Sequence, residues 1–178
     1  MDGKTNRQVA IWLLCGCFLI FSMVILGGIT RLTGSGLSIT EWNVIMGTLP
    51  PLNEHQWQET FEKYKQIPQF HKLNYNYTLD DFKKIFFWEY LHRLVGRLIG
   101  IVFLLPFIYF LSKRKLNTEW IKKSLFLFAL GCLQGFLGWF MVKSGLTERT
   151  SVSQYRLAIR SEEHTSELQS PYVISYAV

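Results

Sequence analysis

Three long apolar runs alternate with polar stretches along this chain of 178 residues. The first covers residues 8–29 and contains no charged side chain, the second covers about residues 82–111, and the third covers residues 124–142. About 20 consecutive apolar residues suffice for a helix to cross the hydrocarbon core of a bilayer. The pattern therefore predicts an all-α, polytopic membrane helical bundle with three complete spans. Residues from 154 onward are typical of the start of a fourth span.

The polar segment between the first two runs, residues 30–81, is far longer than a simple connection and is therefore expected to be functional. Within it, Asn53 is a candidate cap for a short helix. Three aromatic side chains would share one face of that helix: Trp57, Phe61 and Tyr64. Such a stripe is typical of a helix that lies in the membrane interface, or of one that packs against the rest of the loop. The sequence leaves both alternatives open.

Short signals mark the second span. Thr78 stands before Asp80 and Asp81, and this pattern predicts a helix cap with acidic residues in the first turn. Pro106 lies inside the span, where a proline is a common cause of a kink.

The composition supports a membrane protein. Hydrophobic residues make up 49% of the chain and charged residues only 18%, which is too apolar for a soluble domain of this size. The net charge is +6, but the basic side chains stand in short runs beside the apolar segments, as juxtamembrane residues do. We therefore expect the lipid bilayer as a partner and no nucleic acid.

The basic residues also predict the orientation. The short segment 112–123 carries five of them, namely Lys113, Arg114, Lys115, Lys122 and Lys123. Because cytoplasmic loops retain Lys and Arg, this segment is expected on the inner side of the membrane, and the N-terminus, two spans away, lies inside as well. Residues 30–81 and the first turns of the second span then face outward.

The three cysteines, Cys15, Cys17 and Cys132, all lie in the apolar runs. Cys15 and Cys17 are two residues apart and point to different sides of a helix, so they cannot form a simple bridge. We interpret all three as small buried apolar residues and expect neither a disulfide nor a zinc site.

Candidate chemistry is concentrated near the start of the second span. Ionisable side chains are costly inside a membrane and by default mark a functional site. Glu89 and His92 are three residues apart, which places them on one helix face about a turn from each other. A neutral imidazole can bind heme iron axially, and a neighbouring carboxylate can move protons. The pair therefore predicts an iron-porphyrin site with His92 as the metal ligand and Glu89 as the catalytic group.

Each of these side chains also has a structural alternative. His92 could instead bond to a neighbouring helix. Arg93 and Arg97 are candidates to bind porphyrin propionates. Alternatively, they neutralise Glu89 or reach toward lipid headgroups, and for Arg97 this second role is favoured.

Glycines could let another group approach two of the spans closely. Gly96 and Gly100 remove bulk beside His92, which would admit either a flat ring or a neighbouring helix. The third span carries small or amide residues along one side, which predicts close helix packing there: Gly131, Gln134, Gly135 and Gly138.

Several motifs in combination resemble the heme A synthases. They are residues 27–38 (GGITRLTGSGLS), Trp42, residues 47–52 (GTLPPL), residues 89–93 (EYLHR), residues 138–146 (GWFMVKSGL) and residues 155–159 (YRLAI). The resemblance covers nearly all of residues 8–159. Because segment 30–81 has no cysteine, the chain is similar to the mitochondrial and alphaproteobacterial branch of the family.

The resemblance implies an eight-span protein built as two similar four-helix halves, of which residues 1–159 would form the N-terminal half. This half would hold heme O as the substrate, and the C-terminal half would hold a heme b cofactor. The family oxidises a methyl group of heme O to a formyl group, making heme A for cytochrome oxidase. Carried over to this chain, Glu89 matches the essential carboxylate and His92 an axial ligand of the substrate heme.

The resemblance also implies a location and partners. The protein is expected in a bacterial cell membrane or the mitochondrial inner membrane. Heme O synthase would supply the substrate, a homo-oligomer is a further expectation, and the electron acceptor stays open.

The chain departs from the family's pattern after Ile159. The family continues with a histidine, the second ligand of this half, where the chain has Arg160. Residues 160–170 and 174–178 resemble the in-frame translation of a short-read sequencing adapter. We therefore interpret residues 160–178 as an artefactual tail. The parent protein is expected to be active and this truncated polypeptide inactive.

Two other functions compete with the synthase. A non-catalytic membrane b-type cytochrome for electron transfer also needs axial histidines, but it has no need of a carboxylate beside the ligand. A transporter or assembly factor could use Glu89 and Arg93 as a buried ion pair without any heme.

Overall fold

The computed structural model describes residues 3–40 and 50–148, and within these ranges it is helical without strands. Its elements are α1 (Gly3–Leu32), α2 (Glu54–Lys65), α3 (Pro68–Lys72), α4 (Leu79–Ser112) and α5 (Thr118–Glu148). The all-α prediction is therefore confirmed. The predicted start of a fourth span at residue 154 and the predicted tail 160–178 lie outside the described residues, as does part of the 47–52 motif.

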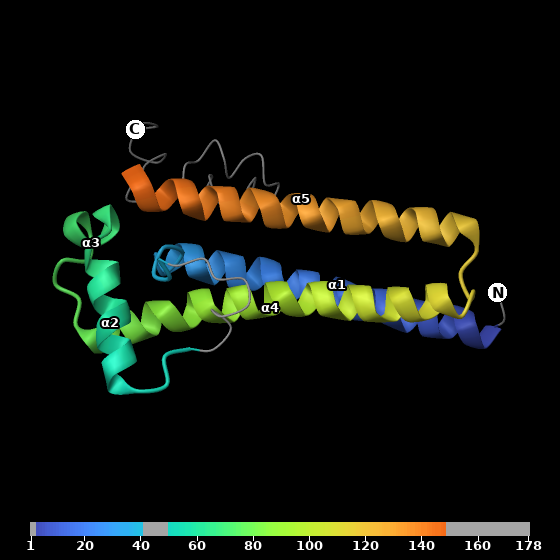
Figure 1. The fold of residues 1–178 in the computed structure, drawn as a ribbon, viewed down its shortest axis with the longest axis horizontal. Coiled ribbons are helices and arrows are strands. Elements are labelled where there is room, and N and C mark those ends of the chain that lie inside the picture. The colour runs from blue at the N-terminus through green and yellow to red at the C-terminus, as the bar shows by residue number, and fades with distance from the viewer. Residues whose placement is uncertain (1–2, 41–49, 149–178) are drawn as a thin grey trace, which may run out of the picture.

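The three long helices lie side by side, with α2 and α3 gathered at one end (Figure 1). Each has a stretch long and apolar enough to cross a membrane: Thr5–Leu32, Leu79–Ser112 and Thr118–Lys143. Many of their large apolar side chains are exposed on the surface of the bundle, as they are in a helix surrounded by lipid. The three predicted spans are thus confirmed, and the helices that contain them extend further at both ends than the apolar runs.

Helix α4 is longer than the membrane requires. Its 34 residues span about 50 Å at 1.5 Å per residue, whereas the hydrocarbon core is about 30 Å thick. The first turns of α4 can therefore project from the bilayer, and there they meet α2, which crosses α4 at a steep angle (Figure 1).

The aromatic stripe of α2 packs inward. Trp57 lies edge-on to Phe86, with ring centroids 5.0 Å apart, and Phe61 and Tyr64 lie 5.2 and 5.1 Å from the ring of Phe82. These rings belong to an aromatic cluster at the α2/α3 end, formed around Leu37, Phe61, Tyr64, Ile67, Phe82, Ile85 and Phe86. The sequence offered packing against the rest of the loop as one alternative; in the structure the stripe contacts Phe70 of that loop and also Phe82 and Phe86 of α4.

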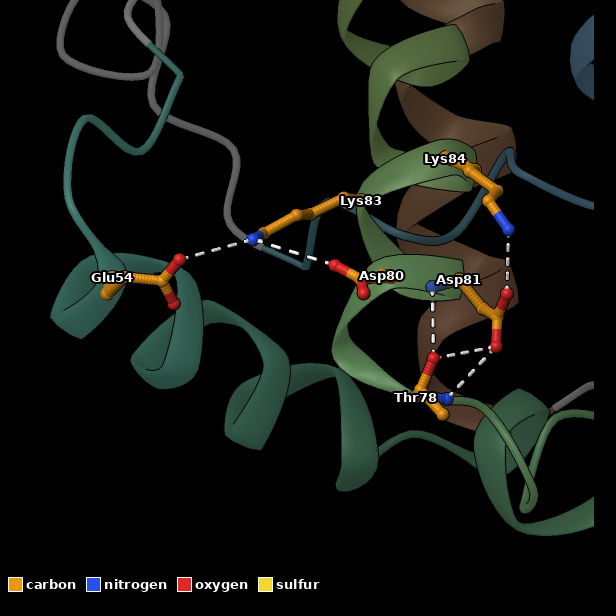
Figure 2. A network of polar contacts seen from close by, with 6 residues as sticks. All are labelled: Glu54, Thr78, Asp80, Asp81, Lys83 and Lys84. Atoms are coloured by element: carbon orange, nitrogen blue, oxygen red, sulfur yellow. Dashed lines mark hydrogen bonds and ion pairs between the residues drawn. The ribbon is translucent and has the colours of Figure 1, made fainter.

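Polar contacts cap both helices that meet at this end. Asn53 accepts a hydrogen bond from the backbone N–H of Gln56 at 2.8 Å, as predicted. Thr78 and Asp81 form the predicted capping box at the start of α4, visible in Figure 2. Beside it, Lys83 reaches both Glu54 of α2 at 3.5 Å and Asp80 at 3.8 Å (Figure 2). Such exposed ion pairs orient the two helix starts but contribute little stability.

Pro106 lies within α4, and the helix continues through it. A proline has no N–H, so the carbonyl four residues earlier, that of Val102, loses its helical partner. The indole N–H of Trp12 on α1 donates to this carbonyl at 3.0 Å. Trp12 also belongs to a second cluster at the opposite end of the bundle, with Val9, Phe107, Phe110 and Leu116. Helix α1 thus supplies the hydrogen bond that the proline removes.

The prediction for the cysteines is wrong in one respect. Cys15, Cys17 and Cys132 are free thiols, as expected, but they are exposed on the outer faces of α1 and α5 and not buried. An apolar face turned to lipid accepts a cysteine as readily as a protein core does, so hydrophobicity alone did not distinguish the two surroundings.

Candidate functional site

Glu89 is the most buried charged residue of the described chain, with only 3% of its surface exposed. It lies on α4 and faces the loop that follows α1. The Ser38 hydroxyl donates to its Oε2 atom at 2.7 Å, and the backbone N–H of Ile39 donates to the same atom at 2.9 Å. The Arg93 guanidinium donates to Oε1 at 2.6 Å. Three donors therefore compensate the carboxylate for the loss of water.

Arg93 holds the same loop from a second side. Its Nη2 atom donates to the carbonyl of Ile39 at 3.0 Å as well as to Glu89. The two side chains are four residues apart on α4 and together bind both the N–H and the C=O of Ile39. One of the alternatives for Arg93, neutralisation of Glu89, is thus present in the structure.

The end of α1 has the geometry that brings Ser38 to this point. Gly34 has a φ of 62°, a left-handed conformation that costs glycine nothing. The N–H of Gly34 donates to the Arg31 carbonyl at 3.0 Å, and the N–H of Ser35 donates to the Thr30 carbonyl at 2.9 Å. This is the Schellman pattern of a helix C-terminus. The Gly-Ser-Gly stretch is therefore a helix cap that turns the chain back toward α4.

A chain of buried polar groups fastens the same turn to α3. Gln69 donates from Nε2 to the carbonyl of Gly34 at 2.8 Å and accepts from the Tyr64 hydroxyl at 3.3 Å. Asn74 donates to the Tyr64 oxygen at 2.7 Å. Burial raises the pKa of the Tyr64 hydroxyl above its ordinary value, so Tyr64 remains a donor well into alkaline solution. The loop from α1 is thus held by α3 at Gly34 and by α4 at Ile39.

His92 lies on α4 three residues after Glu89 and is partly buried. The described residues contain no group of three or more His, Cys, Asp or Glu side chains that could hold a metal ion by themselves. A heme needs no such group, because the porphyrin supplies four ligands and the protein adds one or two axial imidazoles. A partly buried imidazole beside a buried carboxylate fits a heme iron in its donor chemistry.

The glycines behave differently from one another. An ideal Cβ at Gly96 would lie 3.2 Å from the Cε atom of Met23, so this glycine lets α1 approach α4 closely. A Cβ at Gly100 would meet nothing within 4 Å. The same holds at Gly131 and Gly135 of α5, so no neighbouring helix packs closely against these two glycines in the part of the chain that the structure describes.

The sequence offers Glu89, His92, Arg93 and Arg97 as candidates, but it assigns no role to Ser38 and Ile39, which contact Glu89 and Arg93. Ser38 is fully buried, with a relative exposure of 0%, although it is a polar residue in a long polar segment. Ser38 belongs to the motif of residues 27–38, but its contact with Glu89 joins residues 51 positions apart, so no local pattern reveals it.

Comparisons with known proteins agree with this picture. A family model described as cytochrome oxidase assembly protein matches residues 10–159. The heme A synthase of Flavobacterium psychrophilum is 58% identical over 158 residues, 88% of this chain and 47% of that protein. The heme A synthase of Nitrosomonas eutropha is 55% identical over 86% of this chain and 43% of that protein. That of Rhodospirillum centenum is 57% identical over 89% of this chain and 42% of that protein. No solved structure matches. The chain thus spans less than half the length of the curated relatives that it matches.

Proposed function

Since this chain belongs to the COX15-CtaA family of cytochrome oxidase assembly proteins and is an integral membrane protein, we propose that it forms the heme O site of a heme A synthase. The reaction would be the oxidation of a methyl group of heme O to a formyl group. The observation that carries the proposal is the buried Glu89 carboxylate one helical turn from His92, at the end of α4 that α2 and α3 cover.

In this proposal each polar side chain of the site has its own task. His92 would bind the iron of the substrate heme axially. Glu89 would accept the protons released as the methyl carbon is oxidised in successive hydroxylations, while the electrons would pass to an external acceptor. Arg93 would bind a propionate while holding Glu89, and Arg97 would reach toward the lipid headgroups, with a propionate as its alternative partner. The geometry of Glu89 supports its task, because a carboxylate fixed by three donors needs little rearrangement during turnover.

The proposal also covers the surroundings. The basic segment between α4 and α5 and the N-terminus would lie inside, and the loop from residue 30 to the start of α4 outside. Heme O synthase would supply the substrate, and a homo-oligomer would be the assembled form. The heme b that the family resemblance implies would be held by the C-terminal half of the eight-span protein.

A chimera provides the test. Residues 10–159 replace the matching segment of the Flavobacterium psychrophilum heme A synthase, and the chimera is produced in bacteria that make heme O but no heme A. The extracted hemes are separated by chromatography, and the amount of chimera in the membrane is measured alongside the unmodified relative. We expect heme A from the chimera.

Two variants of the chimera separate the roles. Glu89→Gln should retain heme O but produce heme A at least about a hundredfold more slowly, because general acid–base catalysis contributes 10²-fold or more. His92→Ala should lose the bound heme O. If the membrane-inserted chimera retained only protoheme and made no heme A, the b-type cytochrome would be the better interpretation. If it showed no heme bands at all, the heme-free assembly factor would be.

A further inference from the structure

The Ser38 hydroxyl has one proton to donate and two acceptors within reach, the Glu89 carboxylate and the Ile85 carbonyl. Ser38 Oγ lies 2.7 Å from Glu89 Oε2 and 3.5 Å from the Ile85 carbonyl. A hydroxyl donates only one hydrogen bond, and a short bond to a carboxylate is much stronger than a long one to a neutral carbonyl. The proton of Ser38 therefore points to Glu89.

The three donors are divided between the two oxygens of the carboxylate. Arg93 binds Oε1 from the helix that carries Glu89, whereas Ser38 and the Ile39 N–H bind Oε2 from the loop. Holding both oxygens fixes the plane of the carboxylate as well as its position. Within residues 3–40 and 50–148, Ser38 is the one side chain that donates to Oε2, because the other donor to that atom is the backbone N–H of Ile39.

The position of Ser38 does not depend on its own hydroxyl. Leu37, next to it, is 2% exposed and belongs to the aromatic cluster. Gln69 holds the carbonyl of Gly34, and Arg93 holds the carbonyl of Ile39. The backbone is thus anchored on both sides of residue 38, and a variant without the hydroxyl should keep the fold of the loop.

We infer that Ser38 is a positioning residue for Glu89, supplied by the loop to a site that otherwise lies on α4. The inference rests on the proposed function, since it assumes that Glu89 takes part in the oxidation of heme O. Ser38 touches neither the porphyrin nor the reacting carbon in this scheme. It holds Oε2 where the carboxylate can accept a proton, so its removal lowers the rate and not the affinity for the substrate.

The first test uses the chimera and two variants of Ser38. Ser38→Ala removes the donor, and Ser38→Cys keeps nearly the same volume but donates only weakly. Both should lower kcat about tenfold to a hundredfold, with KM for heme O changed less than about twofold, because a hydrogen bond to a charged group is lost. Ser35→Ala is the matched control. Ser35 is an equally buried hydroxyl in the same loop, but it donates to the Thr30 carbonyl at 3.1 Å.

Three results would overturn the inference: a Ser38→Cys variant with the wild-type kcat, a Ser35→Ala variant as slow as Ser38→Ala, or an undiminished effect of Ser38→Ala when Glu89→Gln is already present. The last comparison is the sharpest, because a residue that acts only through Glu89 has nothing to contribute once that carboxylate is gone.

A second measurement needs no activity. In the full 178-residue chain in detergent, the infrared carboxylate band of Glu89 is identified as the band that Glu89→Gln removes. Ser38→Ala should shift this band and Ser35→Ala should not; an unshifted band in Ser38→Ala contradicts the contact itself. If the band shifts but the wild-type chimera makes no heme A, the proposed function fails while the contact stands. If the chimera makes heme A and Ser38→Ala leaves kcat unchanged, only the positioning role fails.

Discussion

Replacing Arg93 by methionine should release the loop between α1 and Ile39. The substitution keeps an unbranched apolar chain but removes both hydrogen bonds of Nη2, to Glu89 at 2.6 Å and to the Ile39 carbonyl at 3.0 Å. The Arg93 and Glu89 side chains are only 11% and 4% exposed, so water screens the remaining negative charge poorly. Breaking such a buried pair from one side costs about 3–5 kcal/mol.

Hydrogen exchange measures this effect where it arises. At about 1.4 kcal/mol for each factor of ten, the peptide covering residues 33–40 should exchange its amide hydrogens roughly a hundredfold to a few thousandfold faster in Arg93→Met. The measurement uses the 178-residue chain in detergent micelles. Lys123→Met is the matched control, because Glu119 and Lys123 have the same spacing and a distance of 2.7 Å but are 70% and 59% exposed. This control should leave exchange in α5 unchanged.

The double variant Glu89→Gln with Arg93→Met decides whether buried charge is the cause. It removes both charges, so residues 33–40 should exchange more slowly than in Arg93→Met alone. Exchange in the double variant that is as fast as in the single variant, or faster, would refute the reasoning, since it would mean that the hydrogen bonds alone hold the loop.

Three further predictions concern other parts of the fold. Trp12→Phe should destabilise the protein by about 1–3 kcal/mol, because the Val102 carbonyl then has no hydrogen-bond donor. Adding Pro106→Ala should recover part of this loss, because an alanine restores the helical N–H. Unfolding in increasing concentrations of SDS measures both effects. In the folded protein, Tyr64 should ionise above the ordinary tyrosine pKa of about 10. The free energy of unfolding that its protonated hydroxyl contributes is therefore complete below about pH 10, the ordinary pKa, and is lost as the pH rises through the pKa of Tyr64 in the folded protein. Alkaline absorbance titration should show the late-ionising tyrosine disappearing in Tyr64→Phe, and an unchanged titration would contradict it. Gly34→Ala should lower the free energy of unfolding by about 1–2 kcal/mol through the backbone strain at a φ of 62°. Steric clash adds nothing, because the nearest atom to the added Cβ lies 3.9 Å away. Thermal unfolding measures the effect, with Gly100→Ala as the control, since a Cβ at Gly100 meets nothing within 4 Å.

The long helices were predictable because their cause is local. A single apolar run of about 20 residues can satisfy all of its backbone hydrogen bonds in lipid by forming a helix, so α1, α4 and α5 follow from the composition along the chain. Thr78 and Asn53 marked helix starts for the same reason, since a cap involves residues only three positions apart. The helix ends extended beyond the apolar runs, because helical hydrogen bonding continues through polar residues.

The environment of each side chain was harder to predict. Hydrophobicity does not distinguish a core from lipid, so the cysteines on α1 and α5 were wrongly expected to be buried. The same ambiguity left two alternatives for the stripe on α2, and the rings of Phe82 and Phe86 on α4 decided between them. Small residues on α5 predicted close packing, but a glycine permits an approach without requiring one.

By itself, the sequence determined that this protein crosses a membrane and that an acid and an imidazole lie a turn apart on one helix, because both properties depend on residues near one another in the chain. Only the tertiary structure decided what surrounds the acid. The donors at Ser38 and Ile39 meet Glu89 across some fifty residues, and the cap at Gly34 and the anchor at Leu37 hold their loop in place. That meeting depends on how α1 and α4 pack together, and no local pattern contains it.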